Sequence, residues 1–380
     1  MEVKLSELKD IIKKILVAYS ATSNLNIIAI SSATENNTIY FDLYNGESFI
    51  SFKLPQESIS TDLVAVVDTK AFTDLVSSLT TETVDLNVKD NLLKISSGKS
   101  SYKLPMIYDG GDLWKPTFMI ANSDQPAVDI SADILKSIDA INTQELSRVK
   151  EDRIKSGAGK LYYLSNNGCF TSANAYGACL NSFTLDGTFE LLLNKTLVKL
   201  FKLFPNGLAL SYEESVINNR PQIKISLMDN TTLATVLAPA DKTIRATMLK
   251  MVYRLKEYAS AIYQTHLVIK AKELKTVLSR LNIAAKHSGR SKEDSSRLAL
   301  TVDGLNLTIT DDFDNSESLD LADNSIVVAK QTIRVFLEDI KPVADLCDTD
   351  FIEIDTNSSG VMIISFNNIK YFLTQLALEN

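Results

Sequence analysis

The chain has 380 residues, of which 45% are hydrophobic and 23% are charged, so it can form two or three soluble domains. Its formal net charge of −8, taken alone, argues against nucleic-acid binding, although such binding depends on where the cations lie and not on their sum. Its three cysteines, Cys169, Cys179 and Cys347, exclude a disulfide framework, and its two histidines leave few candidates for a metal site or a catalytic triad. Because no run resembles a signal peptide or a bilayer-spanning helix, we expect a cytoplasmic protein without a membrane partner.

Six segments have the apolar spacing of amphipathic helices. In chain order they are LSELKDIIKKILVAY, TKAFTDLVSSL, SADILKSIDAI, NKTLVKLFKLF, KELKTVLSRLNIAAK and KQTIRVFLEDI, and they begin near residues 5, 69, 131, 194, 271 and 330. Ser131 is placed to cap the third helix at its N-terminus, and the sixth helix is expected to end near Pro342.

Short runs of alternating or β-branched residues lie between these helices and predict strands. They include NIIAIS, NTIYFDLY, ESFISFKL, LVAVVD, TVDLNV, LLKISS and SYKLP in the first third, and LALTV, LNLTIT, ESLDL, SIVVA, FIEID, VMIIS and IKYFL in the last third. A helix, three strands, a strand with a helix, and three more strands recur about every 130 residues. The sequence therefore predicts an α+β fold of three repeated domains at residues 1–120, 121–245 and 246–380. The linker at residues 241–265 has a pattern that a helix could also adopt.

A Gly-Lys-Ser at residues 98–100 resembles the end of a phosphate-binding loop. Such a loop needs a glycine five positions before Gly98, where this chain has Leu93, and it must open a helix. Here an alternating, strand-like run that ends in proline follows instead. We therefore expect a hairpin turn in which Gly98 has a positive φ.

Other patterns of catalytic or metal-binding residues are missing from the sequence. It contains no Gly-x-Ser-x-Gly, no His-x-x-x-His and no Gly-x-Gly-x-x-Gly, and the acidic run DDFDN lacks the spacing of a calcium loop. The prediction is a protein that is not an enzyme and that uses no cofactor and no metal. A hydrolase with an unrecognised pair of carboxylates stays open as an alternative.

The cations gather on the predicted helices, whereas the strands and turns carry most of the acidic residues. The fourth helix has Lys195, Lys199 and Lys202 on one stripe. The other basic helices contribute Lys9, Lys13 and Lys14, then Lys272, Lys275 and Arg280, then Lys330, Arg334 and Lys341. Each stripe could be an ordinary solvated face. Four such helices together favour one shared anion, for which duplex DNA, bound without sequence specificity, is the obvious candidate.

These repeats resemble the bacterial-type sliding clamp, the β subunit of DNA polymerase III. The resemblance is best in VVDTKAFTDLVSSLTTETVDLNVKDNLLKISSGKSSYKLP and continues in KLYYLS, and the repeat scheme covers essentially the whole chain. Divergent linkers and a divergent chain end favour a phage-encoded member as a hypothesis. The resemblance implies that two chains form a six-domain ring, which encircles duplex DNA and tethers a DNA polymerase after a clamp loader has opened it.

The resemblance also implies functional residues. Helices would line the hole, which adds Lys136, and a nearby loop and strand would touch DNA through Arg148, Lys150, Arg153, Lys160, Tyr162 and Tyr163. A client-binding groove between domains two and three would contain Leu164, Ser172, Ala175, Tyr176, Gly177, Pro239, Leu373 and Leu376. In the dimer interface, the strand of Tyr102 and Leu104 would meet Ile283, Ala284 and an edge strand with Leu305 and Leu307.

One further alternative accounts for the repeats without DNA. A structural or adhesion protein built of repeated α+β domains would explain the repeat scheme and the acidic pI of about 5.1. It would not explain why basic residues gather on the helices.

Overall fold

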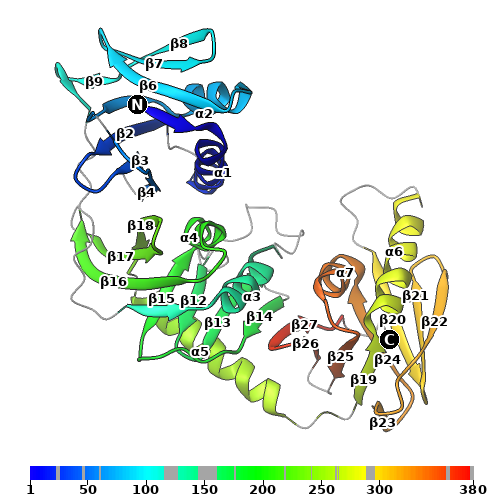
Figure 1. Ribbon diagram of the computed structural model, residues 1–380. Coiled ribbons are helices and arrows are strands. Elements are labelled where there is room, and N and C mark those ends of the chain that lie inside the picture. Colours follow the sequence, from blue (N-terminus) through cyan, green and yellow to red (C-terminus); the bar gives the residue numbers. More distant parts are fainter. Residues whose placement is uncertain are drawn as a thin grey trace. The chain divides into compact units, whose positions relative to one another are not determined.

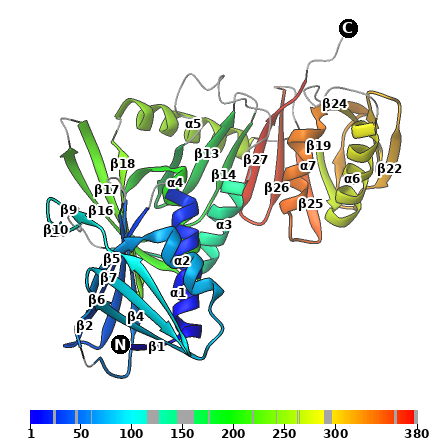
Figure 2. The same cartoon turned by 90° about the horizontal axis from the view of Figure 1, so that it is seen from above.

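A computed structural model gives the fold of the chain (Figures 1 and 2). It describes residues 1–22, 26–44, 48–59, 61–114, 127–143, 161–174, 177–217, 220–240, 242–261, 263, 265–287, 296–356 and 360–376. None of the described helices combines the length and the hydropathy of a membrane-spanning segment.

The order of the elements repeats three times. The first repeat contains β1 (Glu2–Lys4), α1 (Leu5–Thr22), β2 (Ile27–Ala33), β3 (Thr38–Tyr44), β4 (Ser48–Pro55), β5 (Val64–Asp68), α2 (Thr69–Ser78), β6 (Thr83–Lys89), β7 (Leu92–Ser97) and β8 (Ser100–Pro105). The second contains β11 (Val128–Ile130), α3 (Ala132–Thr143), β12 (Leu161–Ser165), β13 (Gly168–Asn174), β14 (Gly177–Asn181), β15 (Glu190–Asn194), α4 (Lys195–Leu200) with the 3-10 turn η3 (Phe201–Leu203), β16 (Leu208–Ile217), β17 (Arg220–Met228) and β18 (Thr232–Pro239).

The third repeat follows the same order. It contains β19 (Thr265–Lys270), α6 (Ala271–His287), β20 (Arg297–Asp303), β21 (Asn306–Asp311), β22 (Ser316–Asp320), β24 (Gln331–Phe336), α7 (Leu337–Leu346), β25 (Phe351–Thr356), β26 (Val361–Phe366) and β27 (Ile369–Thr374). Outside the scheme lie β9 (Tyr108–Asp109), β10 (Asp112–Leu113), α5 (Lys242–Ser260) and β23 (Ile326–Val327). The predicted α+β fold of three repeats is therefore confirmed.

The chain divides into two compact units, which are residues 1–135 with 196–241 and residues 136–195 with 242–380. The first holds a four-stranded sheet, β1-β6-β7-β8, and an eight-stranded sheet, β11-β16-β17-β18-β4-β3-β2-β5. The second holds a nine-stranded sheet, β15-β12-β13-β14-β27-β26-β25-β19-β23, and a four-stranded sheet, β22-β21-β20-β24. Both large sheets join strands of two successive repeats, because β18 pairs with β4 and β27 pairs with β14 (Figure 2).

Local chemistry explains where the helices form. In α1 the apolar side is buried, with Leu8, Ile12 and Ile15 almost inaccessible to solvent. The α2 helix begins where the carboxylate of Asp68 accepts a hydrogen bond of 2.7 Å from the backbone N–H of Ala71. For α3, the predicted cap is confirmed, since Ser131 Oγ accepts from the N–H of Ile134 at 3.5 Å.

Two predictions about the third repeat are corrected. The sixth helix does not begin near residue 330, because residues 331–336 form β24 and α7 begins at Leu337, with Pro342 inside the helix. Ile333 and Val335 are buried at a spacing of two, which is the period of a strand. The ambiguous linker is helical, since α5 occupies residues 242–260.

Candidate nucleic-acid interface

The cations of α1 have partners within their own unit. Lys9 Nζ donates to the carbonyl oxygen of Leu79 at 2.7 Å, and Lys13 pairs with Asp10 at 2.7 Å. Lys14 Nζ lies 3.1 and 3.3 Å from two threonine hydroxyls around the start of β18. Lys13 is the most exposed of the three, so it is the side chain of α1 that is best placed to reach an external anion.

In the second repeat, the predicted cations lie on α3 and on the α4–η3 segment. Lys136 and Lys202 are exposed, and Lys199 is half-buried. The side chain of Lys195 lies outside the described part of the structure. This helical segment buries its apolar side and leaves Lys202 at the surface, as the stripe in the sequence predicts.

The cations of α6 differ in their surroundings. Lys272 is exposed, whereas the Nζ of Lys275 donates to the carbonyl oxygen of Cys347. Arg280 forms an ion pair of 2.7 Å with Glu317 of β22. Both contacts compete with an external anion, so Lys272 is the free-standing cation among these three.

The last predicted stripe does not exist as a helix face. Lys330 precedes β24 and pairs with Asp303 at 3.0 Å. Arg334 lies within β24 and is half-buried, and only Lys341 is helical, in α7, where it contacts Asp345. The expected spacing of these cations on one helix was therefore wrong.

The predicted loop contacts fall mostly outside the described residues. These are Arg148, Lys150, Arg153 and Lys160. The neighbouring Tyr162 and Tyr163 are only 7% and 2% exposed in β12, which argues against the predicted DNA contact of both rings. Burial, together with a hydrogen bond involving Glu190, raises the pKa of the Tyr163 hydroxyl and keeps it neutral.

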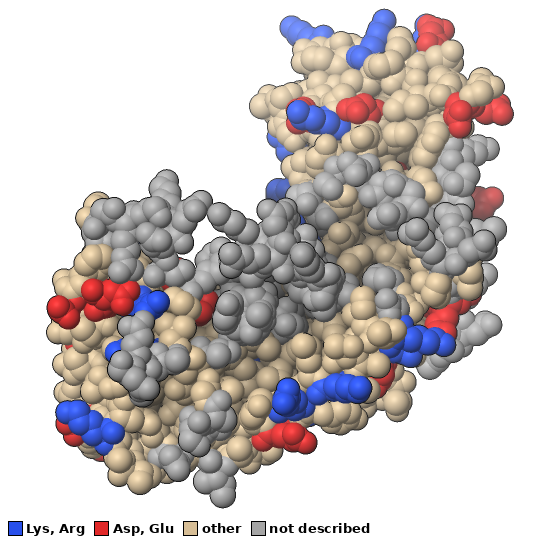
Figure 3. All heavy atoms as spheres, turned by 180° about the vertical axis from the view of Figure 1, so that it is seen from behind, with Lys and Arg blue, Asp and Glu red and all other residues tan. Residues whose placement is uncertain are grey.

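Cations and acids are interleaved on the face of the molecule that Figure 3 draws. Figure 3 shows one face on which blue Lys and Arg side chains lie in small groups close to red Asp and Glu side chains. Among the described residues, no group of three or more His, Cys, Asp and Glu side chains could hold a metal ion. The described cations form no continuous basic patch on the face that Figure 3 draws.

Burial is described for three residues of the predicted client groove, and two of them, Leu164 and Leu373, are buried. Leu164 of β12 and Leu373 of β27 have exposed fractions of 0% and 3%, and Gly177 pairs with Leu373 across the junction between β14 and β27. Leu376 is half-buried, and its N–H donates to the carbonyl oxygen of Arg334 at 2.8 Å. Ala175 and Tyr176 lie outside the described residues, as do the side chains of Ser172 and Pro239. Among the described groove side chains, only Leu376 has an accessible apolar surface.

The predicted edge strand of the first repeat is confirmed. The Gly98-Lys99 turn connects β7 to β8, with φ of +59° at Gly98, and β8 is the last strand of its sheet. Tyr102 is exposed and Leu104 is half-buried. The Gly-Lys-Ser sequence therefore forms a hairpin and no phosphate-binding loop.

The predicted edge strand of the third repeat is wrong. β21 lies inside its sheet between β20 and β22, so Leu307 is fully buried, and β22 provides the edge. Leu305, in the turn before β21, is exposed. Ile283 of α6 is also exposed, and Ala284 is half-buried.

The fold of the chain is similar to that of known structures. No family model matches the chain, and no curated protein matches it. Among solved structures, the beta subunit of the Streptococcus pyogenes DNA polymerase is 13% identical over 99% of both chains, with a TM-score of 0.77. The Helicobacter pylori beta clamp bound to a DNA ligase peptide is 13% identical over 99% of both chains (TM-score 0.74). The Bacillus subtilis DNA polymerase sliding clamp is 14% identical over 100% of this chain and 99% of that one (TM-score 0.74).

This chain has the fold of the bacterial sliding clamp. The resemblance inferred from the sequence is therefore confirmed for the fold, and the low identity makes the chain a divergent example. Within the clamp fold, sequence reasoning missed the role of α5, which packs Met248 and Val252 into a core with strands of the nine-stranded sheet. The signal was the apolar spacing of Ile244, Met248, Val252 and Leu255 along one side of a helix.

Proposed function

We propose that this protein is a DNA sliding clamp, a processivity factor without catalytic activity. Two chains, each of three domains at residues 1–120, 121–245 and 246–380, form a ring around duplex DNA. The clamp tethers a DNA polymerase and other clients, and a clamp loader opens it. The observation that carries this proposal concerns the two four-stranded sheets, one in the first repeat and one in the third. Each is about half the size of the large sheets and ends in a strand that could pair with another chain.

The two large sheets define a rule for joining repeats. In the first repeat the sheet order is β5-β2-β3-β4, and β4 pairs with β18 of the second repeat. In the second repeat the order is β15-β12-β13-β14, and β14 pairs with β27 of the third. Each junction thus joins the third strand after a repeat's first helix to the last strand of the next repeat, in antiparallel register.

Two half-sheets remain once that rule has been applied. The third repeat ends its order β24-β20-β21-β22 at β22, and the first repeat ends its order β1-β6-β7-β8 at β8. By equivalence with the two junctions, β22 of one chain would pair with β8 of a second chain. Exposed edges promote association unless they are covered, and ring closure would cover these two. Lys103 of β8 and the acidic Asp320 of β22 have complementary charges.

Duplex DNA is the ligand that suits the helices. Lys13, Lys136 and Lys272 are exposed and lie on the first helix of each repeat, and Lys202 is exposed in η3 after the second helix of the second repeat. Lysines attract phosphates without reading base edges, so contact would be independent of sequence and would permit sliding. Clients would bind through short peptides, as the Helicobacter pylori clamp binds a DNA ligase peptide, and Leu376 is the accessible described residue of the predicted groove.

Native mass and retention on DNA test the proposal. One chain has a mass of 42.0 kDa, so the ring would have twice that, 84.0 kDa. After loading, the protein should stay on a closed or nicked circle of duplex DNA and leave a linear fragment with free ends. A monomer at micromolar concentration, or equal retention on circular and linear DNA, would contradict the proposal and favour a structural role for the repeats.

A further inference from the structure

The α5 helix covers one face of the nine-stranded sheet. Met248 and Val252 are buried against it, in a cluster that includes Leu180 of β14. The next residue of β14, Asn181, points to the opposite face, where its Nδ2 donates to Ser137 Oγ of α3 at 2.6 Å. Figure 1 shows α3 and α5 on opposite sides of these strands. A ligand on α5 would therefore be separate from one bound by α3.

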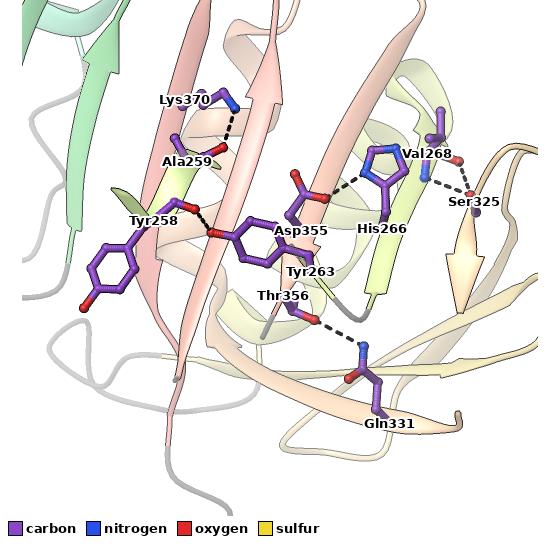
Figure 4. A network of polar contacts seen from close by, with 10 residues as sticks. All are labelled: Tyr258, Ala259, Tyr263, His266, Val268, Ser325, Gln331, Asp355, Thr356 and Lys370. Atoms are coloured by element: carbon purple, nitrogen blue, oxygen red, sulfur yellow. Dashed lines mark hydrogen bonds and ion pairs between the residues drawn. The ribbon is translucent and has the colours of Figure 1, made fainter. Parts of the chain in front are cut away.

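The C-terminal end of α5 is fastened to the sheet. Lys370 Nζ of β27 donates to the carbonyl oxygen of Ala259 at 3.4 Å, and the hydroxyl of Tyr263 donates to the carbonyl oxygen of Tyr258 (Figure 4). A cation at the C-terminal end of a helix also interacts favourably with the helix dipole. These contacts hold the helix with one face against the sheet, so its opposite face is presented to solvent.

The outer side of α5 is strongly basic in an acidic protein. The helix contains five cations and one acidic residue: Lys242, Arg245, Lys250, Arg254, Lys256 and Glu257. All of the cations except Arg245 are exposed. Within the described part of the chain, no ion pair involves Lys250, Arg254 or Lys256. An external polyanion would meet these charges without breaking an ion pair among the described residues.

Tyr253 distinguishes between kinds of polyanion. Its side chain is 61% exposed, and it lies three residues from both Lys250 and Lys256, hence beside them on the helix. Cations that flank an exposed aromatic ring are typical of single-strand binding, in which bases stack on the ring. Lysine is depleted in protein interfaces, and bases inside a duplex are already stacked. A single-stranded nucleic acid therefore fits this surface better than an acidic protein does.

We propose that the outer face of α5 binds single-stranded nucleic acid. Lys250, Arg254 and Lys256 hold backbone phosphates, and a base stacks on Tyr253. The helix has 19 residues and is about 28 Å long, enough for several phosphates along its axis. This site needs neither a closed ring nor topological linkage, so it stands apart from the proposed clamp function.

Binding of a short labelled oligothymidylate, measured by fluorescence anisotropy, tests the site on the full-length protein. The double variant Lys250→Glu/Arg254→Glu should weaken binding at least ten-fold, and Tyr253→Ala about five-fold or more. Lys53→Glu/Lys89→Glu, which changes the net charge equally at exposed lysines elsewhere, should leave binding nearly unchanged. All variants should keep the native mass and the thermal midpoint of the parent.

Three results would overturn the site. The first is that the parent protein does not bind the oligonucleotide. The second is that the Lys53→Glu/Lys89→Glu control loses as much affinity as the α5 double variant. The third is that polyglutamate of matched charge displaces the oligonucleotide as well as unlabelled oligonucleotide does, which would indicate an acidic protein partner. Loss of retention on circular duplex DNA with intact oligonucleotide binding would instead contradict the clamp proposal alone.

Discussion

Ala178 of β14 lies opposite Phe372 of β27, and this pairing makes one sheet from two repeats. The equivalent junction places Ile50 of β4 opposite Ala234 of β18. In both junctions a bulky apolar side chain meets a small one across two antiparallel strands that are far apart in the chain. The same geometry is available to β22 and β8 of two chains, so pairing of these edges can be tested directly.

A proline in β8 should block that pairing. Ser97 and Ser100 flank a two-residue turn and form a hydrogen-bonded pair. Hydrogen-bonded and non-hydrogen-bonded pairs alternate along an antiparallel hairpin, so Lys94 and Lys103 form a non-hydrogen-bonded pair. The backbone N–H of Lys103 therefore points away from β7. Lys103→Pro removes this outward donor and keeps the bonds to β7. We expect a native mass of 42.0 kDa in place of 84.0 kDa at micromolar concentration.

Lys103→Ala is the matched control, because it removes the same charge and keeps the N–H. It should remain largely dimeric. Dimers of normal stability in the proline variant would mean that the edge of β8 is not part of the interface.

Neutralising the basic stripe of the second repeat should weaken retention on DNA. The salt dependence of duplex binding is the slope of log K against log salt. If Lys195, Lys199 and Lys202 each neutralise one phosphate, the triple alanine variant should reduce the magnitude of this slope by about 2.7. The native mass should not change. An unaltered slope would show that these lysines do not face the duplex.

The Gly98 turn should tolerate changes of charge and resist changes of backbone. Gly98 has φ of +59°, a conformation that costs an L-residue about 1 kcal/mol, so Gly98→Ala should lower the free energy of unfolding by that amount. Lys99→Ala should change it by less than about 0.5 kcal/mol. Urea denaturation measures both, and a larger effect at Lys99 would indicate a function for this side chain beyond the turn.

Sequence patterns predicted the repeats better than the pairing of strands. The apolar spacing placed five of the six helices, because each buries one continuous side. It failed at residues 330–336, where Ile333 and Val335 alternate as in a strand while Leu337 and Ile340 begin the next helix. The apolar spacing also could not predict the order of the strands, because the alternation of apolar residues does not indicate which neighbour a strand pairs with. In β22, for example, only Leu319 is buried.

The candidate site was only partly predictable for a related reason. The sequence places Lys13 and Lys272 on solvent faces, where the structure has them. It could not show that Tyr162 and Tyr163 both turn into cores, because β12 is covered on its two faces and both alternate positions are buried. The burial of Tyr163 depends on Met248 and Val252 of α5, a distant segment that local patterns do not contain.

The thiols should be unreactive until the protein unfolds. All three are buried, and burial raises the pKa of Cys169 to about 12 and that of Cys179 well above its usual value. A thiol-specific disulfide reagent at pH 8 should label native protein slowly and all three cysteines in guanidinium. The raised pKa values mean that the folded state favours the neutral thiols of Cys169 and Cys179. The stability linked to these neutral thiols is complete below the unfolded pKa of about 8.5 and is lost as pH rises toward 12. Rapid labelling of native protein would contradict this burial.

The packing of α5 can be separated from its surface by two methionines of the same helix. Met248 is 0% exposed and Met251 is 41% exposed. Met248→Ala should lower the free energy of unfolding by about 2–5 kcal/mol, because it leaves a cavity against Phe170 and Phe372, whereas Met251→Ala should change it by less than about 0.5 kcal/mol. Urea denaturation followed by far-UV circular dichroism measures the difference. Equal effects would mean that the helix is not fixed by one face, and its basic side would then have no constant orientation toward solvent.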